Sequence, residues 1–161
     1  MLVLGVDPGS AHVGWALVSA PASGGFQHWA SGSIDNRPVR EVVARLRGAW
    51  RAHPAPEFTV AVERITQINA RAGFGATMAT GLALGHGVGQ RIVQAFEDDG
   101  VRVEEVTAEK WHLAYFARRA VDGPAVHALV RSRIAGWPTA SNNHQRDAGA
   151  IALWALEGGT A

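Results

Sequence analysis

Two apolar runs that each end in an acidic residue restrict the fold of this chain more than any other feature. Residues 2–6 lead into Asp7, and residues 58–62 lead into Glu63. Runs of this kind are typical of strands that are buried on both faces of a sheet. If the two strands are parallel neighbours, their carboxyl ends meet at one edge of the sheet and the two carboxylates lie together there.

The first third of the chain predicts an antiparallel meander followed by a helix. Strands are expected over residues 2–6, 12–20 and 27–34, where apolar residues are bounded by turn formers. A helix is expected from Pro38 to about Arg51, because its apolar residues recur at helical spacing and prolines follow it.

The remainder of the chain alternates strands with helices. Strands at 58–63 and 101–106 enclose a helix at about 76–98, and this order is typical of parallel crossover units. The last third is expected to be helical over residues 108–119, 124–135 and 144–157. Together these elements predict an α/β fold with a mixed five-stranded sheet flanked by helices.

Composition favours one globular domain over residues 1–161. Hydrophobic residues make up 47% of the chain and charged residues 18%, which is enough apolar material for a buried core. The uncharged stretch at residues 73–89 holds six glycines and is a poor membrane span. The chain opens directly on a strand-like run rather than a signal peptide, and it has no cysteine. We therefore expect a cytoplasmic protein without a membrane partner.

The net charge of +1 conceals an unusual choice of cations. Arginine accounts for 14 of the 15 basic residues, and Lys110 is the sole lysine. Arginine suits phosphate because its planar group donates two parallel hydrogen bonds, so a basic face for nucleic acid is one interpretation. A GC-rich genome that encodes arginine by default is the other.

A histidine and an acid lie close together near the carboxyl end of the chain. His144 and Asp147 are three residues apart at the start of an apolar helix, so they project from one face. If that helix packs at the sheet edge that carries Asp7 and Glu63, four ligands converge. Magnesium and manganese accept such ligands, and two ions about 4 Å apart can clamp a phosphate.

Each of these residues also has an ordinary structural interpretation. Asp7 is a common turn residue before Pro8, and Glu63 can be a solvated acid at a strand end. His144 and Asp147 lie in the first turn of a helix, where the helix dipole favours an acid. Their occurrence together and in this order favours a metal-dependent phosphodiesterase.

Three motifs resemble the RuvC-type Holliday-junction resolvases. The segment 4–10, followed by 14–18, resembles the family's opening motif; residues 62–64 resemble its second acidic motif, and residues 147–152 its closing helix. The resemblance spans nearly the whole chain. It implies a ribonuclease-H-like fold, a homodimer, and paired magnesium-dependent nicks across a four-way junction.

The resemblance also implies roles for single residues. Asp7, Glu63 and Asp147 match the family's metal ligands, and His144 stands where some members have a histidine. Asp7 is expected to bridge two divalent ions, Mg²⁺ or Mn²⁺. Lys110 matches a family lysine and is the candidate for steadying the phosphate, although it can also be a plain surface cation.

The connection between the strand at 58–63 and the following helix is a candidate DNA contact. It contains Arg64, Arg71 and the turn around Phe74, close to the expected metals and suited to the DNA backbone. An ordinary solvated loop is the alternative. The chain departs from the family because Phe74 is the first aromatic after Glu63, and because Asp122 occupies a stretch that is commonly basic.

Gly81, Gly85 and Gly89 recur every four residues along the helix at 76–98. Each glycine costs a helix about 1 kcal/mol relative to alanine, so three in register indicate close approach by another segment. The family resemblance places a second protomer there. Packing of this helix on its own sheet is an almost equal alternative.

The sequence therefore predicts a structure-selective endodeoxyribonuclease that resolves Holliday junctions. A broader nuclease for flaps and forks and a non-catalytic junction-binding module are the alternatives. A fragment of an actin-like ATPase or sugar kinase also opens with a similar acid and turn, but the chain is short for the two lobes of such a protein.

Overall fold

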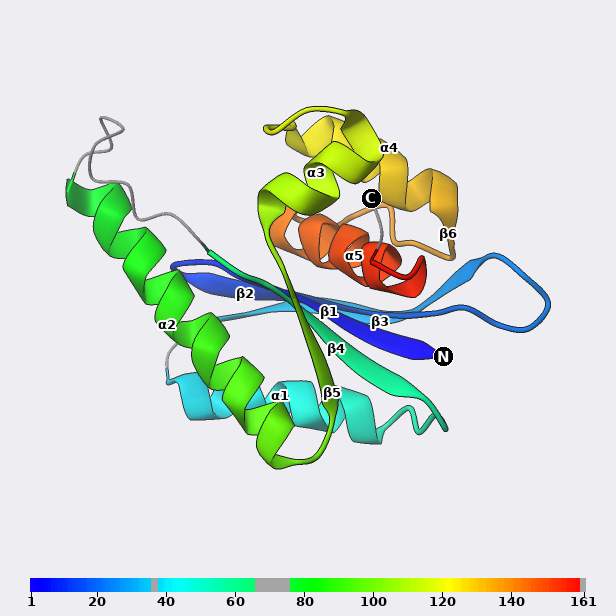
Figure 1. The fold of residues 1–161 in the computed structure, drawn as a ribbon, viewed down its shortest axis with the longest axis horizontal. Coiled ribbons are helices and arrows are strands. Elements are labelled where there is room, and N and C mark those ends of the chain that lie inside the picture. Colours follow the sequence, from blue (N-terminus) through cyan, green and yellow to red (C-terminus); the bar gives the residue numbers. More distant parts are fainter. Residues whose placement is uncertain (36–37, 66–75, 160–161) are drawn as a thin grey trace.

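The structure is a computed structural model that describes residues 1–35, 38–65 and 76–159. Its sheet has the strand order β5-β4-β1-β2-β3-β6 (Figure 1). The strands are β1 (Leu2–Pro8), β2 (His12–Ser19), β3 (Phe26–Asp35), β4 (Phe58–Glu63), β5 (Arg102–Val106) and β6 (Ile134–Ala135). The helices are α1 (Val39–Arg51), α2 (Ala76–Asp98), α3 (Ala108–Phe116), α4 (Gly123–Arg133) and α5 (Asn143–Leu156).

Strand β1 lies in the middle of the sheet and is buried along its length. It pairs antiparallel with β2, where Asp7 faces Gly14. It pairs parallel with β4, where Val6 lies beside Val62, so that Asp7 and Glu63 follow at the same edge. The expected parallel pairing of the two acid-ending strands is therefore confirmed.

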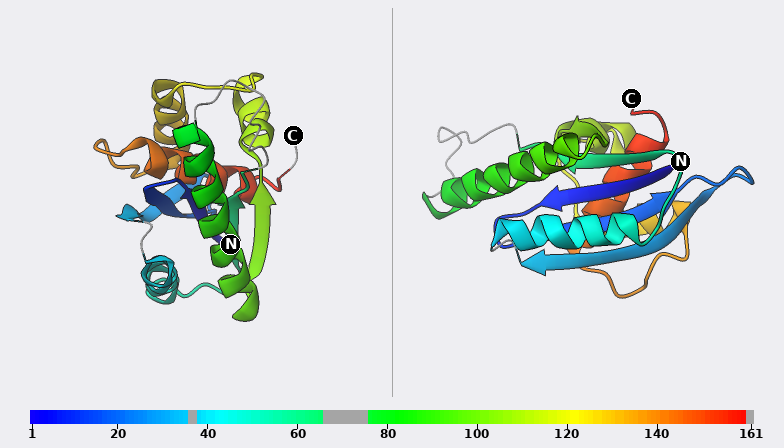
Figure 2. Two further views of the ribbon diagram at one scale, coloured as in Figure 1. Left: turned by 90° about the vertical axis from the view of Figure 1, so that its left-hand side faces the viewer. Right: turned by 90° about the horizontal axis from the view of Figure 1, so that it is seen from below.

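The helices cover the sheet in two layers, and each layer encloses its own apolar core. Helices α3, α4 and α5 lie on one face, and α1 and α2 lie on the other; Figure 2 shows the sheet between them. The first core includes Trp111 and most of α5, and the second includes Leu46 and Phe96. Burial on both faces explains why the central strands are apolar without alternation.

Helix α5 packs directly on β1 and β2 because both strands carry glycine where it crosses. A Cβ on Gly5 would overlap the carbonyl oxygen of Ala148, and a Cβ on Gly14 would overlap that of His144. The backbone of α5 therefore approaches the sheet more closely than any side chain would allow.

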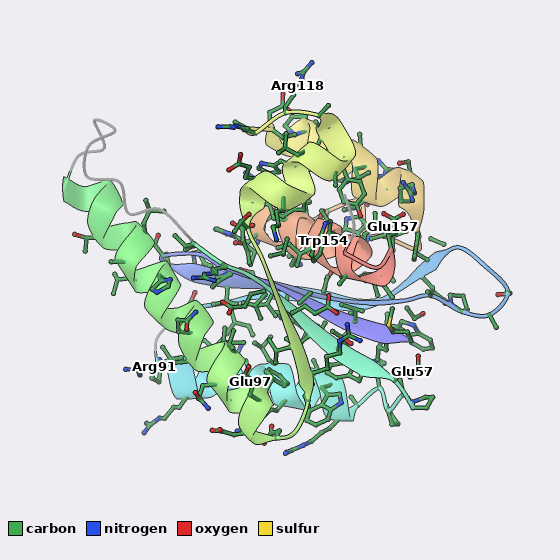
Figure 3. All side chains as sticks on the ribbon, in the orientation of Figure 1. Glu57, Arg91, Glu97, Arg118, Trp154 and Glu157 are labelled. Atoms are coloured by element: carbon green, nitrogen blue, oxygen red, sulfur yellow. The ribbon has the colours of Figure 1, made fainter. Side chains whose placement is uncertain are left out.

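The structure differs from the predictions in two places. The sheet has a sixth strand, β6, where two residues pair with Phe26 and Gln27 of β3; the prediction had continued the helix through them. Helix α3 ends at Phe116 rather than Arg119, because Ala117 adopts a left-handed conformation with φ of 52°. Beyond it, Arg118 points away from the sheet (Figure 3).

The remaining bounds agree with the sequence to within two residues. Pro38 precedes the first turn of α1, and the side chain of Asp122 caps α4 by accepting from the backbone N–H of Ala125 at 2.9 Å. That cap gives Asp122 a structural role at the position where the family is commonly basic. In the described part of the chain, no helix combines the length and apolar character needed to cross a bilayer.

Candidate metal and nucleic-acid site

Asp7 and His144 form the tightest contact at the carboxyl edge of the sheet. Asp7 is 9% exposed, and its Oδ2 lies 2.5 Å from Nδ1 of His144. The hydrogen bond with Asp7 raises the pKa of His144, because the carboxylate stabilises the imidazolium. Two segments separated by most of the chain therefore meet here.

The start of α5 positions His144 and Asp147. Asn142 and Gln145 form a capping box, in which the Asn142 side chain accepts from the Gln145 N–H and the Gln145 side chain accepts from the Asn142 N–H, both at 2.9 Å. This box fixes the first turn of the helix. Gly14 lets that turn lie against β2, and Gly9 lies beneath the His144 ring.

Glu63 and Asp147 complete a group of three carboxylates. Burial raises the pKa of Glu63, and the nearby charge of Asp7 raises it further. Burial, and then the charge of Asp7, raises the pKa of Asp147 to about 7. For both acids the first cause is burial and the second is the charge of Asp7, which disfavours a further negative charge nearby. Within the predicted set of Asp7, Glu63, His144 and Asp147, the direct contact that the structure shows is the one between Asp7 and His144.

The donor set suits hard divalent cations. Three carboxylates and an imidazole at one edge are ligands that Mg²⁺ and Mn²⁺ accept, and a cation would relieve the repulsion between the acids. Among the described residues, however, no three His, Asp or Glu side chains already form a group that could hold an ion. Ion binding therefore requires these side chains to adjust, beginning with the direct Asp7–His144 contact.

A cleft of about 540 Å³ opens beside Asp7 and Glu63. Its other walls include the turn at Pro8–Ser10, together with Ile65, Gly81 and Leu82. The amino-terminal half of α2 extends past the carboxyl edge of β1 and forms one side of this cleft (Figure 1). Two of the acids thus face a space that is open to a ligand.

The glycine stripe of α2 packs on the turn that follows Asp7. A Cβ on Gly85 would lie 2.7 Å from the carbonyl oxygen of Pro8, and a Cβ on Gly89 would lie 3.1 Å from the Pro8 ring. A Cβ on Gly81 would lie 3.3 Å from Cβ of Ser10. Of the two interpretations of the stripe, packing within the chain is the one that the structure shows.

The structure describes two of the four residues that the sequence predicts to contact DNA. Arg64 follows β4 and is exposed, and its backbone N–H donates to the Val106 carbonyl at 2.7 Å. Lys110 is exposed in the first turn of α3, one residue before a side chain that contacts Glu63. Arg71 and Phe74 lie outside the described residues.

Two residues at the site were missed by the sequence analysis. Trp111 is 1% exposed, and its Nε1–H donates to Glu63 Oε2 at 3.1 Å. Nδ1 of His12 lies 2.9 Å from Oδ1 of Asp35, and the His12 ring centre lies 6.5 Å from that of His144. Neither residue belongs to a spacing pattern. The only signal for Trp111 was its place directly after Lys110.

The fold and the acidic edge together define the class of protein. A three-stranded meander that continues into parallel crossovers, with acids where β1 and β4 end, is a ribonuclease-H-like arrangement. No protein-family model matches the sequence, and no curated protein matches it either.

Several solved structures are similar to this chain over nearly its whole length. RuvC of Thermus thermophilus in complex with a Holliday junction substrate is similar, with a TM-score of 0.68, 20% identity, and coverage of 98% of this chain and 96% of that one. Another structure of T. thermophilus RuvC has a TM-score of 0.62 and 26% identity over 98% of this chain and 97% of that one. The fowlpox virus Holliday junction resolvase has a TM-score of 0.57 and 15% identity over 99% and 100%. The chain therefore has a fold similar to that of these Holliday junction resolvases.

Proposed function

We propose that this protein is an endonuclease that cuts four-way DNA junctions with the help of divalent metal ions. The observation that carries the proposal is that Asp7, in contact with His144, and Glu63 face the same open cleft at the carboxyl edge of the sheet. The similar T. thermophilus protein was solved with a Holliday junction substrate, and the similar fowlpox protein is a Holliday junction resolvase, which supports the same substrate here.

Two Mg²⁺ or Mn²⁺ ions, when bound, would activate water and neutralise charge that develops on the scissile phosphate. Asp7 would contribute to both ions, and Glu63, Asp147 and His144 would complete their shells. Lys110 and Arg64 are exposed near Glu63 and would hold the DNA backbone. We keep Arg71 and Phe74 as proposed contacts on the basis of the sequence.

We further propose that residues 1–161 act as one nuclease domain in the cytoplasm and pair into a homodimer. A two-fold dimer presents two sites to a nearly two-fold junction, so that a small chain can make paired cuts. The packing of the α2 glycines within the chain leaves the exposed side of that helix, including Ala83 and Leu84, as the surface available for pairing.

The proposal is tested by cleavage of end-labelled DNA. Purified protein is incubated with four-way junction, flap, fork and linear duplex substrates in Mg²⁺ or Mn²⁺, and the nicks are mapped. We expect symmetric paired nicks on the junction. Asp7→Asn should reduce cleavage by at least about 1000-fold while junction binding and thermal stability persist, because the residue acts in the chemical step.

The other outcomes separate the alternatives. Cuts spread over flaps and forks would indicate a broader branched-DNA nuclease. Binding without cuts in either metal would indicate a junction-binding module, and cleavage retained by pure Asp7→Asn protein would rule out this site.

A further inference from the structure

We propose that Trp111 is a positioning residue for Glu63, whose indole N–H holds one carboxylate oxygen so that the other oxygen is presented to a divalent ion. The inference rests on the proposed function, because it assigns a role at the same site. It adds a residue that contacts none of the reacting atoms and acts only through Glu63.

The contact is direct and comes from a rigid part of the molecule. Trp111 Nε1 donates to Glu63 Oε2 at 3.1 Å. Glu63 is the last residue of β4 and pairs with Val106, the last residue of β5. Helix α3 begins two residues later, where Thr107 accepts from the Lys110 N–H. The acceptor Glu63 is therefore fixed by β4, and the donor Trp111 is fixed by a helix that begins two residues after the neighbouring strand β5.

The indole ring has little freedom to move. Trp111 is 1% exposed and belongs to the core between the sheet and α5, and its ring packs edge-on against His112 with ring centres 4.0 Å apart. A ring held on all sides keeps its N–H in one direction. A carboxylate that accepts from such a donor is held in one rotamer, and the oxygen that accepts the hydrogen bond is less available to a metal ion.

A comparison with the other buried tryptophans shows that this acceptor is unusual. Trp137, also in the core beneath α5, donates to the hydroxyl of Ser141 at 3.3 Å. Trp154 has no partner for its buried Nε1 among the described residues. Only Trp111 of these three donates to a carboxylate of the proposed ligand set. A ring needed solely for packing would not require that acceptor.

The matched variants are Trp111→Phe and Trp137→Phe. Both remove a buried indole donor and keep an aromatic ring in the same core, so both carry a similar packing cost. Trp111→Phe should raise the Mg²⁺ concentration for half-maximal nicking about 10-fold, the effect expected for a residue that orients a ligand. The rate at saturating Mn²⁺ should change much less, because Mg²⁺ demands stricter octahedral geometry. Trp137→Phe should leave the metal dependence unchanged.

A second measurement needs no catalysis. In the ¹⁵N,¹³C-labelled wild-type protein, the Trp111 and Trp137 indole resonances are assigned through their contacts with the sequentially assigned backbone, so that no variant is needed for the assignment. Titration with Mg²⁺ alone should shift the Trp111 resonance with the same midpoint as the protein's Mg²⁺ binding measured by calorimetry. The Trp137 resonance should not move. In Asp7→Asn the shift should require more Mg²⁺.

The results separate this inference from the proposed function. If the wild type binds Mg²⁺ and nicks junctions, but Trp111→Phe has the same metal dependence and the Trp111 resonance stays still, the positioning role is overturned alone. If the wild type neither binds Mg²⁺ nor cuts DNA, both proposals fall. If Trp111→Phe does not fold, the wild-type titration still decides, because a fixed resonance overturns the role and a moving one supports it.

Discussion

Helices α5 and α2 both reach the region of Asp7, but they do so in opposite ways. Under α5 the glycines are on the sheet, and a Cβ on Gly5 would overlap the backbone of the helix itself. Under α2 the glycines are on the helix, and a Cβ on Gly85 would meet the Pro8 carbonyl and the Ile65 side chain at 2.7 and 2.8 Å. The α5 contact thus joins backbone to backbone, whereas the α2 contact meets a turn and the end of a side chain that can move.

The difference corresponds to what each helix contributes. Helix α5 carries His144 and Asp147, so its position sets distances between proposed ligands. Helix α2 contributes Gly81 and Leu82 to the wall of the cleft. A shift of α5 would therefore change the ligand geometry, whereas a shift of α2 would change the shape of the opening.

The largest expected effect comes from Gly5→Ala. The added methyl group overlaps the Ala148 carbonyl and lies 2.8 Å from the Ala152 nitrogen, so α5 has to move away from β1. We expect a loss of about 3 kcal/mol or more in the free energy of unfolding, at the upper end for overpacked sites. Chemical denaturation measures it.

Gly48→Ala is the control for this comparison. Gly48 lies in α1 with no atom within 4 Å of the added Cβ, so the same change should stabilise the protein by about 0.5–1 kcal/mol. Equal effects at Gly5 and Gly48 would show that α5 does not pack as closely as described.

A smaller effect is expected on the α2 side. Gly85→Ala should cost about 1–2 kcal/mol, because Ile65 can turn aside and the clash with Pro8 is less severe. Gly87→Ala on the same helix meets nothing within 4 Å and should be stabilising. Thermal unfolding of the pair, at about 2–4 °C per kcal/mol, provides the measurement. A loss at Gly85 as large as that at Gly5 would erase the distinction between the two helices.

The smallest expected effect is a pH dependence that belongs to the α5 side. Since the folded protein raises the pKa of Asp147 to about 7 and also raises that of Glu63, it binds more protons than the unfolded chain above pH about 4. The stability contributed by the protonated acids is complete below that pH and is lost as the pH rises through about 7. Without metal, the melting temperature should therefore fall by a few degrees between pH 5 and 8.

Magnesium should offset that fall, because the ion binds the ionised acids of the folded state. In Asp147→Asn the fall should be smaller, since the buried amide does not ionise. A melting temperature that rises from pH 5 to 8 in the metal-free wild type would contradict the placement of these acids.

The sequence was sufficient to predict the strands of the central sheet and the parallel pairing that brings the ends of β1 and β4 to one edge. Apolar runs mark β1 and β4 because both of their faces are buried, and the crossover through α2 explains why β4 and β5 are parallel neighbours. The spacing of His144 and Asp147 on one helix placed both on one face. These features depend on local periodicity, which a single sequence displays.

The elements that the sequence did not predict depend on contacts between distant segments. Strand β6 has two residues, too few for an alternating pattern, and exists only because β3 lies beside it. The end of α3 at Ala117 has no glycine to mark it. Trp111 looked like any core aromatic, because its acceptor lies 48 positions away in the chain.

The capping box at Asn142 lies at the start of the last helix and is therefore made late in synthesis. Synthesis proceeds from the amino terminus, so β1, β2 and β4 leave the ribosome before α5 does. Pairing of β1 with β4 in that early sheet can bring Asp7 and Glu63 to the same edge. His144 reaches Asp7 only when the last helix, which also carries Asp147, docks across β1 and β2. A nascent chain therefore has half of the proposed donor set, and the proposed cleavage has to wait for the final folding step.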